Sequence, residues 1–73
     1  MSEEERKLVD DFLDIAKANN FSYNVVFAMG AVAFDKGTTE QDSIEILKCL
    51  INLAAKYPNE ADFLEEVGKR FIG

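Results

Sequence analysis

Histidine is absent from this 73-residue chain, and cysteine and proline occur once each. Without histidine the chain lacks the commonest general base and metal ligand of proteins, which excludes Ser-His and Cys-His nucleophile pairs and histidine-bearing zinc sites. The single cysteine, Cys49, cannot form an intramolecular disulfide or a Cys-rich metal cluster. We therefore expect no enzymatic activity, no cofactor and no bound metal ion.

Basic residues are scarce as well, because 8 lysines and arginines stand against 14 aspartates and glutamates, for a formal net charge of −6. This charge repels phosphate backbones and anionic lipid headgroups, so we expect neither a nucleic acid nor a membrane as a partner. The longest apolar stretch, residues 25–34, is about half as long as a helix that spans a bilayer. The acidic start, Ser2 to Glu5, is the opposite of a signal peptide, and together with the single cysteine it predicts a cytoplasmic protein.

Apolar residues make up 48% of the chain and include six Phe and two Tyr, which is enough for one packed core. Apolar side chains recur at helical spacing in four segments, at about residues 3–18, 22–36, 39–57 and 60–72. The connections between them are only a few residues long, as adjacent antiparallel helices require. The sequence therefore predicts an all-α fold, a compact bundle of four short helices in a single domain, residues 1–73.

Residue types that cap helices stand at the start of each segment. The candidate caps are Ser2 with Glu5, Asn20 or Ser22, Thr38 with Gln41 or Thr39 with Asp42, and Asn59. At the other ends, Gly37 is placed to close the second helix in the left-handed conformation, and Pro58 stops the third.

The second segment, 22–36, differs from the others because it is apolar on every side. One side of its helical wheel carries Tyr23, Val26, Phe27, Gly30 and Phe34, and the other carries Val25, Ala28, Met29 and Val32. Such a helix must be surrounded, so we predict that it is the centre of the bundle or that a partner covers an exposed patch of it. Gly30 lowers helix propensity by roughly 1 kcal/mol and lets another backbone approach closely. A β-hairpin turning at Gly30 is the alternative, although no turn dipeptide such as Asn-Gly supports it.

The excess of apolar surface on the second and third helices predicts a protein-interaction module that associates with a second copy of itself. The candidate interaction residues are Val25, Met29, Gly30, Val32, Ala33, Ile46 and Leu53. The alternative is a small acidic inhibitor, antitoxin or phage-type effector that occupies a basic site on a larger protein, for which size and net charge are the supporting observations.

The stretch Asp42-Ser43-Ile44-Glu45 resembles the Asp-Ser-Leu motif of acyl carrier proteins, which are also small, acidic and four-helical. The resemblance covers four residues and implies that Ser43 faces solvent and carries a phosphopantetheine arm. Helical periodicity instead places Ser43 within the apolar arc of its helix. A carrier protein that uses Ser43 is a further alternative, although this placement of Ser43 does not favour it.

Two other patterns in the sequence could carry a function. Asp10 and Asp14 lie one turn apart and could hold a hard cation, but the neighbouring Arg6 favours a solvated face whose charges pair with one another. A helix-turn-helix through Gly37 would place the acidic residues 40–42 at the start of its recognition helix, where phosphates would repel them.

Overall fold

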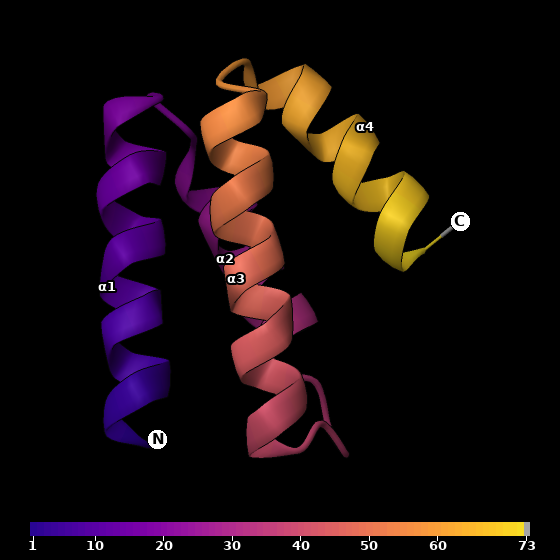
Figure 1. Ribbon diagram of the computed structural model, residues 1–73. Helices are drawn as coiled ribbons and strands as arrows, with labels where there is room; N and C mark the ends of the chain where they lie inside the picture. The colour runs from indigo at the N-terminus through magenta and orange to yellow at the C-terminus, as the bar shows by residue number, and fades with distance from the viewer. Residues whose placement is uncertain (73) are drawn as a thin grey trace.

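Four α-helices form the computed structural model, which describes residues 1–72: α1 (Glu3–Ala18), α2 (Tyr23–Ala33), α3 (Glu40–Lys56) and α4 (Glu60–Phe71) (Figure 1). No strand occurs among the described residues. The expected all-α fold of four helices is therefore confirmed, and the hairpin at Gly30 is excluded because this residue lies inside α2.

Side-chain caps start each helix where the sequence predicts them. Around Ser2 a complete capping box forms, in which the Glu5 N–H donates to Ser2 Oγ (3.1 Å) and the Ser2 N–H donates to Glu5 Oε1 (2.8 Å). Where two caps were possible, the structure selects Ser22 for α2 and Thr39 for α3, and Asn59 caps α4. Each of these side chains accepts hydrogen bonds from backbone N–H groups that the first helical turn leaves free.

The end of α2 was predicted wrongly, because the helix stops at Ala33 instead of continuing to Lys36. Asp35 explains the early stop, since its Oδ1 accepts the Lys36 N–H at 2.8 Å and this local bond competes with helical hydrogen bonding. Gly37 does adopt a positive φ of 92°, but it does so in the turn that follows, where the Thr38 N–H donates to the Asp35 carbonyl.

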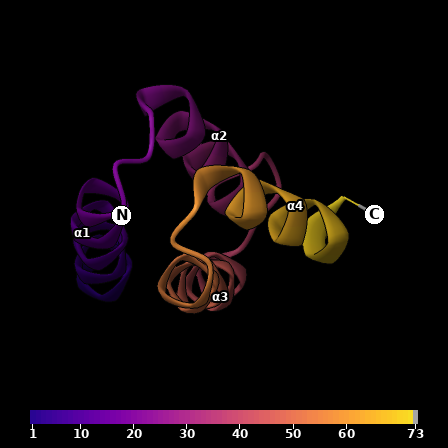
Figure 2. The same ribbon diagram turned by 90° about the horizontal axis from the view of Figure 1, so that it is seen from above.

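The central position belongs to α3 and not, as predicted, to the second helix. α3 packs against all three other helices, and it runs beside α1 in the same direction (Figure 1). Seen from above, α1 and α2 stand apart on different sides of the molecule (Figure 2). With 17 residues and a broad apolar arc, α3 can serve three neighbours, whereas α2 has only 11 residues.

An aromatic cluster lies where α4 joins the core. Phe63 is fully buried, with its ring centroid 4.8 Å from Phe21 and 6.3 Å from Phe12. Two hydrogen bonds reinforce this end, from Asn19 Nδ2 to the Ala54 carbonyl (2.9 Å) and from the Ser22 N–H to Glu60 Oε1 (2.6 Å). The core contains Phe12, Ala16, Val25, Met29, Ala33, Leu47, Leu50, Ala54, Phe63 and Val67.

Candidate interaction surface

An apolar groove lies between α1 and α2, with buried leucines of α3 contributing to its lining. Its volume is about 360 Å³, and none of its lining residues has a polar or charged side chain. The lining residues are Val9, Phe12, Leu13, Val26, Phe27, Met29, Gly30, Ala31, Phe34, Leu47 and Leu50. We call this hollow the α1–α2 groove.

The start of α2 contacts α4 through side chains, although the Phe21 N–H also donates to the Ala16 carbonyl of α1 at 2.9 Å. Phe21, in the connection before α2, packs on Phe63 of α4, and the adjacent Ser22 N–H donates to Glu60 at the start of α4. Within the connection, Asn20 takes the left-handed conformation with φ 63°, which an asparagine tolerates better than most residues. The chain therefore turns away from α1, and the backbones of α1 and α2 scarcely approach each other.

Large apolar side chains stand exposed along α2 beside the groove. Tyr23 is 82% exposed, Phe27 is 74% exposed, and Phe34, which caps the end of α2, is 38% exposed. We call Tyr23, Phe27 and Phe34 the aromatic stripe. Leu13 of α1 faces the groove from the other side and is 42% exposed. Single exposed apolar residues are ordinary, but a contiguous set around an apolar hollow is typical of an interaction site.

A second hollow, of about 410 Å³, continues this surface toward the start of α2. It shares Leu13 and Val26 with the α1–α2 groove and extends to Phe21 and Tyr23. Lys17 is the one charged residue in the linings of the two hollows. Apolar surface is thus available along the whole side of α2 that faces α1.

The structure places the seven residues predicted for interaction in three different environments. Val25, Met29 and Ala33 are buried in the core, where they contribute to folding, and Met29 also lines the α1–α2 groove. Gly30 is half-buried and lines the α1–α2 groove. The remaining three, all half-buried and away from that groove, are Val32, Ile46 and Leu53.

The exposed apolar residues beside the groove that the prediction omitted are Leu13 and the aromatic stripe. The helical wheel does group Tyr23, Phe27 and Phe34 together with Gly30, and this shared side is the signal that could have identified them. It was not decisive, because α2 has almost no polar residue to mark which of its sides faces solvent.

Ser43 is buried, with 3% of its surface exposed, in agreement with its place in the apolar arc of α3. This position is the opposite of the solvent-facing serine that the resemblance to acyl carrier proteins implies. Attachment of a phosphopantetheine arm would require the Ser43 hydroxyl to leave the core.

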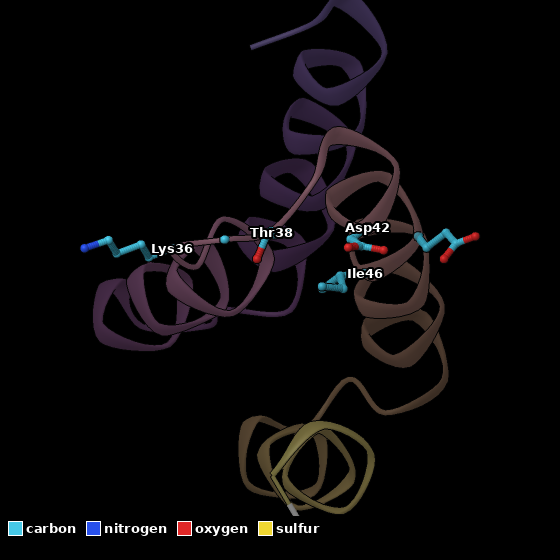
Figure 3. Close-up of a pocket in the computed structure, with 6 residues that line it drawn as sticks. Lys36, Thr38, Asp42 and Ile46 are labelled. Carbon is cyan, nitrogen blue, oxygen red and sulfur yellow. The ribbon is translucent and has the colours of Figure 1, made fainter.

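The polar hollows of the molecule bring no set of reactive groups together. One, of about 390 Å³, lies where α2 connects to α3, and in it the Lys36 side chain extends away from Asp42 (Figure 3). Another lies between α3 and α4, where the Lys69 ammonium is 3.3 Å from Glu66 and 3.8 Å from Glu65. The hydrogen bond to Glu66 and the charges of both glutamates raise the pKa of Lys69, so its charge is already paired.

Within residues 1–72, no three side chains of Cys, Asp or Glu lie close enough together to hold a metal ion. Of the helices in this part of the chain, none has the length and hydropathy needed to cross a membrane. Comparisons of the chain with protein-family models, with curated proteins and with solved structures found no match.

Proposed function

We propose that the protein is a non-catalytic interaction module that associates with a second copy of itself through the α1–α2 groove and the aromatic stripe. The observation that carries this proposal is the apolar surface of α2, which remains exposed beside an apolar hollow in an otherwise well-packed fold. Surfaces of this kind on small proteins mark contact sites with other proteins. A symmetric pair is the commonest assembly of identical chains.

The distribution of charge permits a second copy as the partner. The net charge of −6 makes two copies repel each other over most of their surface. From Tyr23 to Phe34, however, the chain contains no charged residue. Two copies can therefore meet through α2 without bringing like charges into contact, whereas a basic partner would find no carboxylate there to pair with.

The alternative of an acidic inhibitor is supported by the size and the net charge of the chain alone. A cytoplasmic location is part of the proposal, because a reducing compartment would keep the free, half-buried Cys49 reduced.

Sedimentation equilibrium over a range of micromolar concentrations tests the proposal. We expect a mass that rises toward twice the chain mass of 8.2 kDa. The Phe27→Asp variant should stay near the mass of one chain and remain folded, because the Phe27 side chain is largely exposed. Ile72→Asp is the matched control, since Ile72 is equally exposed but follows α4, and it should dimerise normally. A wild-type mass of 8.2 kDa at every concentration would rule the proposal out.

A further inference from the structure

We infer that the two-fold axis of this dimer passes beside Gly30 and that Phe27 of each copy enters the α1–α2 groove of the other. This inference rests on the proposed function and specifies how the two copies fit together. It also gives Gly30 a role in the dimer, because a larger side chain at this position would fill the groove.

The surface carries both halves of a self-complementary contact. Phe27 projects from α2 and is largely exposed, and the groove beside it is an apolar hollow large enough to receive side chains. A symmetric pair requires that one patch supply both the projecting group and the cavity, because each contact occurs twice. An apolar ring entering this groove leaves no polar group without a hydrogen-bond partner, since the lining has none.

The spacing of the residues locates the axis. Phe27 and Phe34 are seven residues apart and lie on the same side of α2, so they are separated by about 10 Å along the helix. Gly30 and Ala31 are midway between them. When two α2 helices cross in opposite directions at this midpoint, Phe27 of one copy lies beside Phe34 of the other. The two small residues at the centre then allow the helices to come close.

Gly30 has no evident role within a single chain. A glycine inside a helix is less stable than an alanine, and here nothing lies within 4 Å of the position that a Cβ atom would occupy. No contact in the monomer therefore requires glycine. Since Gly30 also lines the groove, its missing side chain keeps open the space that an incoming ring would fill.

The exposed area of the chain fits this assembly. A compact monomer of 8.2 kDa is expected to expose about 4,500 Å², and this chain exposes 4959 Å². Elongation does not explain the difference, because the radius of gyration, 11.3 Å, is close to the roughly 11 Å expected for 73 residues. The excess of about 400 Å² is half of what each subunit of a standard dimer buries, and the surrounding rim can supply the rest.

The decisive variant is Gly30→Leu, which fills the groove. Gly68→Leu is its matched control, because Gly68 also lies within a helix and also has open space around its Cβ position. In sedimentation, Gly30→Leu should raise the dimer dissociation constant at least about 30-fold, the effect of a central contact residue. Gly68→Leu should leave it unchanged. At a concentration low enough for the wild type to be monomeric, both variants should melt at or above the wild-type temperature, since each gains helix propensity.

Cross-linking reports the geometry directly. In a Cys49→Ser background, Phe27→Cys chains mixed with Phe34→Cys chains should form a covalent dimer on mild oxidation, because a disulfide needs Cα atoms within about 7 Å. Tyr23→Cys chains mixed with Phe34→Cys chains should not. If Gly30→Leu dimerises like wild type while Phe27→Asp does not dimerise, the inference is overturned and the proposed function stands. A wild-type protein that stays monomeric, or that binds only a helix of another protein in this groove, overturns both.

Discussion

The two flanks of α1, one facing α3 and the other facing α2, differ in how closely they pack against the neighbouring helix. Toward α3, α1 packs closely along its length, with the Asn19 side chain bonded to Ala54 near one end and Glu4 within 4.0 Å of Lys48 nearer the other. Toward α2, the same helix borders a groove that no side chain of the protein fills. The start of α2 contacts α4 at Phe21 and Ser22, and the helix packs on α3 and α4 more than on α1.

This contrast indicates how a chain without a sequence motif can still have a binding surface. The closed flank buries its apolar residues within the chain and stabilises the fold. On the open flank, residues of the same chemical type remain available, and burying them is left to a partner. Substitutions on the closed flank should therefore lower the free energy of unfolding of the single chain. Substitutions on the open flank should instead weaken the association of two chains.

The largest expected effect comes from comparing the same substitution in the core and on the open flank. Phe63→Ala removes a ring that is fully buried between Phe12 and Phe21, so it should lower the free energy of unfolding by about 3–5 kcal/mol. Phe27→Ala removes a ring that is mostly exposed, and should cost about 0.5 kcal/mol or less in the monomer. Urea denaturation followed by circular dichroism at low protein concentration measures both. Similar losses for the two variants would show that Phe27 is packed as tightly as Phe63.

Most of the fold could be predicted from the sequence, because its local signals agree with one another. Ser2 with Glu5, and Asn59, mark helix starts through hydrogen bonds that depend only on neighbouring residues. The arcs of α1, α3 and α4 also have clear polar sides, which set the direction each helix faces. The end of α2 was missed because a competing local bond from Asp35 ended the helix before Gly37.

The candidate surface could not be predicted in the same way. Periodicity shows which residues of α2 share a side, but choosing the buried side requires polar residues on the other, and Asn24 is the only one in this helix. The choice is made by contacts distant in sequence, such as those of Phe21 with Phe63 and of Ser22 with Glu60. For this reason Val25 and Ala33 were expected at an interface and lie in the core, away from the α1–α2 groove.

A smaller effect is expected at the hydrogen bond that ties the closed flank together. Asn19→Asp replaces the amide that donates to the Ala54 carbonyl with an acceptor, and it places a negative charge at the end of α1. We expect a loss of about 2 kcal/mol near neutral pH. Below about pH 4 the new carboxyl is protonated and can donate again, so the loss should shrink. Asn52→Asp, on the exposed side of α3, should change stability by no more than about 0.5 kcal/mol and show no such recovery.

The smallest effect concerns the hydrogen bond that joins the start of α2 to the start of α4. Glu60 and Glu40 are each the first residue of a helix, so replacing either with alanine removes the same favourable interaction with the helix dipole. Only Glu60 also accepts the Ser22 N–H, at 2.6 Å in an exposed position. Thermal melts should therefore show Glu60→Ala to be about 0.5 kcal/mol less stable than Glu40→Ala. Because this bond anchors the start of α2, Glu60→Ala should also weaken dimerisation, and Glu40→Ala should not. Identical behaviour of the two variants would mean that the aromatic contact of Phe21 with Phe63 is sufficient to hold the start of α2 against α4.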